Sequence, residues 1–453
     1  MITKSSHSAN IANRLDRLPI SKFHMGVVVA LCLAYFFELG DLNTFAYVAP
    51  ALEKQWHLSV GIIGFITSAS FLGMFLGAVI GGWFADKTGR RRALILMVAF
   101  YSIFSLLNAI AWNPMSLGIF RFLTGVGLSS MTIVANTYIS ELFPTKSRGR
   151  YQALCMTFGL IGIPATSWVA RLIVPAAPWA WRLVFVWGAL GIIFLLFTRA
   201  MEESPRWFEI HGDTDAANAV MSRIESRVQQ QMGTLPEAET PTASPTIKGV
   251  PYGELFGKSY KGRTFLLLAI WIFQTLGFYG FVAWVPTLLA AHGISLVSTL
   301  TYSSVIAVAA PLGALVAFTT ADVIDRKWLL VAASLAACVF GFIYGLTFTP
   351  ALIMIFGFLM VLSIQFFAPI VYAYTPELYP TEARASGVGF NYGIGRLVNI
   401  LGPLIVAALY TSSGYGSVFI YVGACWIIVA LVAGIFGPKT SQRRLEQLSQ
   451  SAV

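Results

Sequence analysis

Long apolar runs separated by short polar loops dominate this chain of 453 residues. About twelve runs are about 20 residues long, which is enough for a helix to cross ~30 Å of hydrocarbon. The pattern predicts an all-α membrane protein with twelve transmembrane helices. The expected spans lie near residues 25–48, 60–82, 93–112, 115–139, 151–173, 183–200, 264–286, 299–320, 328–348, 350–374, 385–409 and 416–437.

Two loop motifs between these runs occur twice. Residues 82–91 read GWFADKTGRR and are echoed by residues 319–327, while residues 141–148 read ELFPTKSR and are echoed by residues 377–384. In both cases the copy follows the original by 236 positions. One shared offset indicates a tandem duplication. We therefore expect two pseudo-symmetric six-helix halves with a substrate site between them.

The apolar and polar blocks also predict a domain organisation. A Pro/Thr-rich stretch in the middle of the chain has little tendency to fold and marks a tether between the halves. The expected parts are a cytoplasmic N-terminal segment (1–24), an N-terminal bundle (25–200), a cytoplasmic linker (201–262), a C-terminal bundle (263–437) and a cytoplasmic tail (438–453).

Composition and charge support the membrane prediction. The chain is 57% hydrophobic and 11% charged, whereas soluble domains are about 45–50% apolar and about 25% charged. Of its 30 basic residues, 25 lie at the ends and in the even-numbered loops. This asymmetry predicts cytoplasmic termini, so the net charge of +10 reflects topology rather than nucleic-acid binding. Residues 1–24 have no apolar core, so we expect no cleavable signal peptide and a multi-pass protein of the cell membrane.

The sequence offers no chemistry of catalysis. The four cysteines lie inside apolar spans, where they act as small hydrophobes, and their spacing suggests neither a metal site nor a disulfide framework. There is no set of nucleophile and base and no phosphate-binding loop. We therefore expect neither an enzyme nor a cofactor. The expected partners are the lipid bilayer, protons and a small-molecule substrate, and we expect a monomer.

Charged residues within the spans are the candidate chemical groups, because a charge at membrane depth is costly and usually faces a cavity or a partner. Glu38 and Asp41 share one face of span 1, and two such close carboxylates cannot both ionise easily in an apolar setting. We expect Asp41, helped by Glu38, to carry a proton, with Arg121 of span 4 as its switching partner. A structural ion pair between Asp41 and Arg121, or an Arg121 that reaches to the membrane edge, is the alternative.

The second half lacks these acids. Gln274 and Gly277 stand where the duplication places Glu38 and Asp41, which suggests that protons pass through the N-terminal half. Arg396 in span 11 has no obvious acidic partner and predicts a carboxylate site, although hydrogen bonds to helix carbonyls would also satisfy it. The expected substrate-binding residues are Arg396, Gln274, Tyr279, Trp284, Gln365, Tyr372, Asn391 and Asn399. For any single aromatic residue among them, ordinary packing or a place in the lipid belt is the simpler interpretation.

By these motifs the chain resembles the major facilitator superfamily over nearly its whole length. Residues 82–91 are similar to the superfamily signature between spans 2 and 3. The ELFPTKSR loop, its copy and the ESPRW motif at 203–207 resemble the branch of sugar porters, aromatic-acid/proton symporters and nicotinate transporters. The resemblance implies a proton-coupled or facilitative small-solute carrier that works by alternating access. It also aligns Asp41 with the span 1 acid of proton-linked sugar porters.

The substrate prediction is a small organic acid, either aromatic or like a sugar acid. Family members for organic acids carry an arginine in the region of Arg396. The stretch from Gln274 to Tyr279 keeps the Gln and Gly of a sugar porter but has Tyr in place of Asn, which counts against a hexose. A sugar or polyol carrier, an organic cation carrier and a non-transporting membrane sensor are the alternatives.

The loop motifs predict a conformational latch. Asp86 is placed to interact with a nearby helix N-terminus and with Arg148, although charge that only sets topology is the simpler interpretation. The expected gating residues are Asp86, Arg90, Arg91, Glu141, Arg148, Asp322, Arg326, Glu377 and Arg384.

Glycines in two spans predict close helix packing. The stripe Gly73, Gly77 and Gly81 lies on one face of span 2, and the pair Gly389 and Gly393 lies on one face of span 11. Small residues at this spacing let helices approach each other closely.

Overall fold

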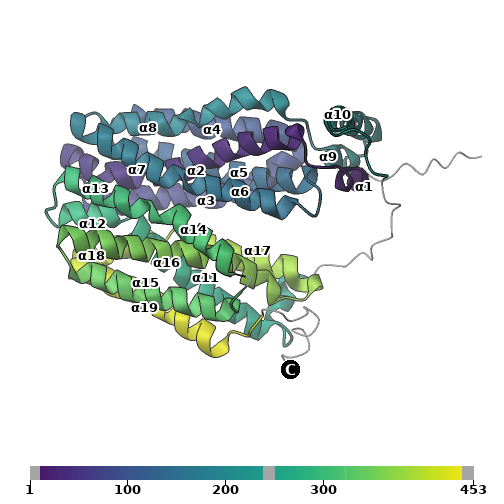
Figure 1. Cartoon of the computed structure of the whole chain (residues 1–453). Coiled ribbons are helices and arrows are strands. Elements are labelled where there is room, and N and C mark those ends of the chain that lie inside the picture. Colours follow the sequence, from purple (N-terminus) through teal and green to yellow (C-terminus); the bar gives the residue numbers. More distant parts are fainter. Residues whose placement is uncertain (1–10, 238–249, 322, 441–453) are drawn as a thin grey trace, which may run out of the picture.

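A computed structural model describes residues 11–237, 250–321 and 323–440. Within these residues, twelve helices or helix pairs are long and apolar enough to span a membrane, and Figure 1 shows them as two stacked halves. The N-terminal half contains α2 (Lys22–Trp56), α3 (Val60–Thr88), α4 (Arg90–Ala109), α5 (Pro114–Leu142), α6 (Arg148–Leu160) followed by α7 (Gly162–Ile173), and α8 (Trp181–Ala189) followed by η2 (Leu190–Ala200).

The C-terminal half repeats this arrangement. It contains α11 (Lys261–Val282) followed by α12 (Val285–Ala291), α13 (Leu296–Ala307) followed by α14 (Ala309–Thr320), α15 (Arg326–Leu346), α16 (Pro350–Glu377), α17 (Thr381–Val398) followed by α18 (Gly402–Ser413), and α19 (Tyr415–Phe436). The predicted fold class, twelve helices in two six-helix halves, is therefore confirmed.

Four of the spans are divided into two α-helices, which the apolar pattern does not predict. Each of α6, α11, α13 and α17 ends four or five residues before a proline, namely Pro164, Pro286, Pro311 and Pro403. A proline ring clashes with the carbonyl four residues earlier and lacks an N–H to donate, so the helix bends or stops there. Pro50 is an exception, because α2 continues through it to Trp56 and extends beyond the predicted end at 48. Pro369 and Pro376 are further exceptions, because α16 continues through both of them.

The glycine stripe of α3 packs as predicted. A side chain on Gly73 or Gly77 would strike the backbone of α5 at Phe122 or Val126, so only glycine permits this approach. The predicted packing of the pair on α17 is wrong: nothing described lies within 4 Å of a Cβ on Gly393, and only a distant tyrosine hydroxyl lies near one on Gly389. This face of α17 borders open space.

The halves meet mainly at one end of the bundle. There α3 packs against α18, α7 against α13, and α2 against α12. Two hydrogen bonds cross between the halves at this end: Ser167 and Ser304 hydroxyls are 2.9 Å apart, and Arg171 Nε donates to Thr301 Oγ1 at 2.5 Å. The opposite end, which carries α9 (Pro205–Ile210), α10 (Thr214–Met232) and η3 (Tyr252–Phe256), is called the linker end below (Figure 1).

A small polar and apolar cluster covers the linker end of the N-terminal half. The short helix α1 (Ile11–Asp16) lies on α10, where Arg14 and Arg17 both form ion pairs with Glu225 at 2.6 Å. Burial opposes ionisation of Glu225, but the hydrogen bonds and charges of the two arginines hold its pKa below the usual value. The linker helix is thus fixed to the half from which it emerges.

Candidate substrate and proton sites

Asp41 and Arg121 form a fully buried ion pair inside the N-terminal half. Their side chains are 0% and 1% exposed, and Arg121 Nη1 lies 3.3 Å from Asp41 Oδ2. Ser105 of α4 donates to the other carboxylate oxygen at 2.7 Å. Removing one partner of such a pair leaves an uncompensated buried charge, which costs about 3–5 kcal/mol. The two residues are therefore strongly coupled.

The surroundings of the pair are built from small groups. Gly188 of α8 lies so close that any side chain there would strike the Asp41 carboxylate. Arg121 also donates from Nε to Ser70 of α3 at 3.3 Å and from Nη2 to the Leu42 carbonyl at 3.4 Å. Four helices thus hold the pair. The sequence offered no sign of Ser105, Ser70 or Gly188, because these contacts join distant helices.

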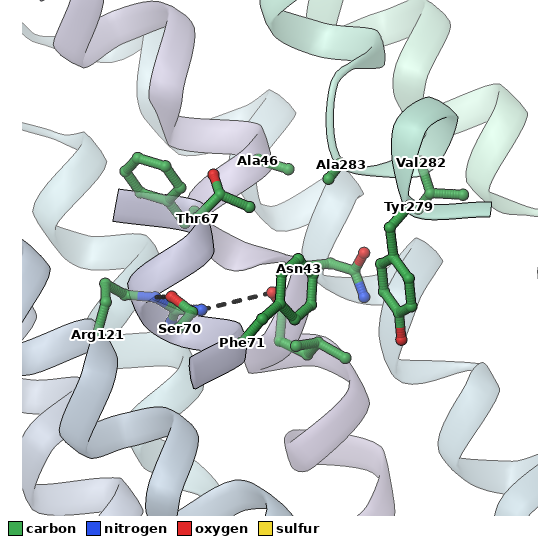
Figure 2. A pocket seen from close by; sticks show the side chains of 11 residues that line it. Asn43, Ala46, Thr67, Ser70, Phe71, Arg121, Tyr279, Val282 and Ala283 are labelled. Atoms are coloured by element: carbon green, nitrogen blue, oxygen red, sulfur yellow. Dashed lines mark hydrogen bonds between the residues drawn. The ribbon is translucent and has the colours of Figure 1, made fainter. Parts of the chain in front are cut away.

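A small pocket connects Arg121 to the space between the halves. Figure 2 shows Arg121 and Ser70 on one side of it, with Tyr279 of α11 on the other. The Tyr279 ring meets Phe71 of α3 edge to face, with 4.8 Å between the ring centroids. Predicted residue Tyr279 therefore lies at the junction of the halves, in the same pocket as Arg121.

Glu38 lies one turn from Asp41 on α2 and is buried. Its side chain is 4% exposed, and Thr132 of α5 donates to its Oε1 at 3.0 Å. Glu38 lies within electrostatic reach of Arg396 across the interface and of Asp41 on its own helix. An acid of one half thus lies within range of the charge of a base of the other half.

Arg396 is half-buried on α17, and its contacts are with tyrosine rather than with an acid. Its Nε donates to the hydroxyl of Tyr392 at 2.9 Å, and its Nη2 donates to the same oxygen. Tyr372 of α16, which is 52% exposed, lies 5.7 Å from the Tyr392 ring. Among the described contacts Arg396 makes no ion pair. The sequence missed Tyr392, although its spacing of four from Arg396 places both on one helix face.

Other predicted substrate residues are more scattered. Gln274 is buried and donates to Thr275 at 2.8 Å, and Gln365 lines a second pocket that also touches Tyr47. Asn399 is buried beside Tyr279, and its amide oxygen has no hydrogen-bond partner among the described residues.

Two predicted positions do not join the Arg396 cluster. Asn391 donates to the Gly387 carbonyl at 2.7 Å and to Tyr379 at 3.1 Å. Five residues turn a helix by about 500°, so Asn391 and Arg396 point in different directions. Trp284 is 1% exposed and lies at the α3 contact near Gly64.

Arg90 is the centre of the loop cluster in the N-terminal half. It lies 2.9 Å from Glu141 and 2.9 Å from Asp86, and Arg91 N donates to Glu203 of the ESPRW motif at 2.9 Å. The predicted contact between Asp86 and Arg148 is wrong in this conformation, because Asp86 pairs with Arg90 across the tight turn at Gly89. Arg148 is exposed.

The C-terminal copy reproduces this cluster in part. Arg326 lies 2.9 Å from Glu377, which is the equivalent of the pair Arg90 and Glu141 at the offset of 236. Arg384 donates to the Pro376 carbonyl at 3.2 Å. Asp322 lies outside the described residues.

Fold and contacts together define a membrane transporter built from two duplicated halves with ionisable groups between them. The model of the sugar (and other) transporter family matches residues 25–452. The chain therefore belongs to this family of the major facilitator superfamily, whose members are transporters and not enzymes.

The relatives agree with this assignment. The chain is 46% identical to the putative metabolite transport protein YyaJ of Bacillus subtilis, over 98% of each chain. It is 28% identical to the niacin transporter NiaP of Acinetobacter baylyi, over 97% of this chain and 99% of that protein. It is also 28% identical to the 4-hydroxybenzoate transporter PcaK of Acinetobacter baylyi, over 87% of each chain.

A solved structure has the same fold. The xylose transporter XylE from E. coli, in a partially occluded inward open conformation, superimposes with a TM-score of 0.74. The match covers 94% of this chain and 100% of that one at 17% identity.

Proposed function

We propose that this transporter takes up a small organic acid across the cell membrane together with protons, by alternating access. The observation that carries this proposal is Arg396, a guanidinium within range of Glu38 in the other half that has a phenol instead of a carboxylate as its partner. A guanidinium without an acid retains its full charge and matches a carboxylate in geometry. A substrate anion would supply the missing partner.

The surroundings of Arg396 suit an acid that carries a ring. Tyr372 is exposed next to it, and Tyr279, Gln274 and Asn399 offer polar groups on nearby helices. Niacin and 4-hydroxybenzoate, the substrates named for two relatives, each have a carboxyl group on an aromatic ring. This agreement supports an aromatic acid before a sugar acid.

Proton coupling would run through the N-terminal half. A proton on Asp41 would neutralise the carboxylate and weaken its hold on Arg121. The buried charge of Arg121 would then be uncompensated, which would favour a different conformation of the carrier. Glu38 would sense the substrate, because a carboxylate at Arg396 brings a second negative charge close to it. Loading both ligands would cancel these charges and let the halves rock.

The loop clusters would act as gates at the linker end, which the charge asymmetry places in the cytoplasm. The pairs Arg90–Glu141 and Arg326–Glu377 each lie within one half here, at the end where the halves have their weaker contact. We propose that Asp86, Arg91, Arg148 and Arg384 make contacts across the halves once this end closes.

Uptake by purified protein in proteoliposomes tests the proposal. The panel is nicotinate, benzoate, a sugar acid, a hexose and an organic cation, each with and without an inward proton gradient, in wild type and Arg396→Gln. Gradient-driven uptake of an acid that disappears in the variant supports the proposal. Uptake of the hexose or the cation that is indifferent to the variant contradicts it.

A further inference from the structure

Tyr392 holds the guanidinium of Arg396 in one orientation. Both Nε and Nη2 of Arg396 donate to the Tyr392 hydroxyl oxygen, and the guanidinium carbon lies 5.0 Å from the centre of the Tyr392 ring. The two residues are one helical turn apart on α17. A side chain as flexible as arginine would otherwise sample many rotamers, so this contact selects one of them.

Tyr392 is itself fixed by rings from two other helices. Its ring meets Trp271 of α11 at 5.5 Å, nearly perpendicular, and Tyr372 of α16 at 5.7 Å. Trp271 and Tyr372 meet each other at 5.1 Å. The Trp271 indole donates to Thr375 at 3.0 Å and so cannot turn freely. The support for Arg396 therefore spans three helices.

The nature of the partner decides what Arg396 can bind. A phenol hydroxyl is a neutral acceptor, so it orients the guanidinium without cancelling its charge. It occupies the edge formed by Nε and Nη2, and no described hydrogen bond uses Nη1. The edge formed by Nη1 and Nη2 remains available for two parallel hydrogen bonds to a carboxylate.

We propose that Tyr392 is a positioning residue that sets the preference of this carrier for carboxylates over neutral isosteres. The inference rests on the proposed function, since it assumes that Arg396 receives the substrate anion. An amide analogue of the acid cannot use the same charge, so only the acid depends on the orientation of the guanidinium. The preference between the two is therefore the property that Tyr392 controls.

The experiment uses the full chain in proteoliposomes, with the acid that the panel identifies and its amide, for example nicotinate and nicotinamide. KM and kcat are measured for the acid, and the inhibition constant for the amide. In Tyr392→Phe, which keeps the ring and loses the hydroxyl, the guanidinium loses the oxygen that accepts from both Nε and Nη2. We therefore expect the KM for the acid to rise about tenfold. The kcat for the acid and the inhibition constant for the amide should change by less than about twofold, which is clearly smaller than the expected change in KM.

Tyr344→Phe is the matched control, because the Tyr344 hydroxyl is buried on α15 with no hydrogen-bond partner among the described residues. This substitution should leave both the KM for the acid and the inhibition constant for the amide unchanged. Should Tyr392→Phe fail to fold, Trp271→Phe loosens the same support. It should also reduce the preference of the carrier for the acid over the amide.

Two outcomes overturn the inference and are distinguishable. If Arg396→Gln removes the acid preference but Tyr392→Phe leaves it intact, or weakens acid and amide equally, Tyr392 does not position Arg396 and the proposed function stands. If Arg396→Gln leaves the preference intact as well, the proposed function fails together with the inference.

Discussion

The two halves of this transporter share a frame and differ in chemistry. The pairs Arg90–Glu141 and Arg326–Glu377 occupy equivalent positions with the same 2.9 Å separation. The buried site of the N-terminal half has no such copy. At the offset of 236, its Asp41, Ser105 and Arg121 become Gly277, Gly341 and Gly357.

The space left by these glycines is filled with apolar and aromatic side chains. A Cβ on Gly277 would meet Trp426, one on Gly341 would meet Met360, and one on Gly357 would meet Ile306. Conversely, the position equivalent to Arg396 is Leu160 in the N-terminal half. The two halves thus share the Arg–Glu pairs of their loops. The Asp41–Arg121 pair, in contrast, belongs only to the N-terminal half and Arg396 only to the C-terminal half. This separation suits a carrier whose proton and anion must be bound together to neutralise each other.

The largest effect is expected when the buried acid of the N-terminal half is removed. Asp41→Asn keeps a hydrogen-bonding group beside Ser105 and Arg121 but cannot take up a proton. We expect gradient-driven accumulation of the acid to be lost completely, while exchange of labelled for unlabelled substrate continues. Asp215→Asn is the control, since Asp215 is exposed on the linker helix α10. Accumulation that survives in Asp41→Asn would place proton coupling elsewhere.

The second test removes the base of the C-terminal half, Arg396. Arg396→Gln should weaken the apparent affinity for the acid about 10- to 100-fold, because hydrogen bonds to a charged group contribute about 1.5–3 kcal/mol. Arg384→Gln, on the same helix at the linker end, should bind the acid normally. Substrate protection in thermal unfolding gives the affinity. Equal binding by Arg396→Gln and wild type would exclude Arg396 from the site.

The glycines provide a test of packing that is independent of transport. Gly77→Val would force a side chain into the backbone of α5, and overpacking of this kind costs about 1–3 kcal/mol. Gly393→Val borders open space and should leave the unfolding temperature in detergent nearly unchanged. Equal destabilisation by the two substitutions would mean that α17 packs more tightly than the structure shows.

The smallest expected effect distinguishes the two loop pairs. Both carboxylate oxygens of Glu141 accept from Arg90, whereas Glu377 Oε2 is buried without a described partner. Glu141→Gln should therefore cost about 0.5–1.5 kcal/mol of stability, and Glu377→Gln less. Chemical denaturation of the two purified variants measures the difference, and a larger loss in Glu377→Gln would contradict it.

The fold could be predicted from the sequence because spans and duplicated loops leave local signals. The interruptions of α11 and α17 were missed, although Pro286 and Pro403 carry the signal, because apolar runs hide a helix break. The candidate residues Asp41, Arg121 and Arg396 could also be predicted, because a charged residue within an apolar run is conspicuous. The pairing of Asp41 with Arg121 could be predicted as well, but the aromatic support of Arg396 could not. Trp271 reaches Tyr392 from another helix, and only the folded arrangement brings them together.

The most direct test of the division between the halves is proton movement driven by the substrate. Proteoliposomes that contain a pH-sensitive dye receive an inward gradient of the acid without a proton gradient, with protein-free liposomes as the baseline. The account predicts that wild type acidifies the lumen, that Asp41→Asn admits the acid without this protein-dependent acidification, and that Arg396→Gln does neither. Acidification by Asp41→Asn equal to that of wild type would contradict it.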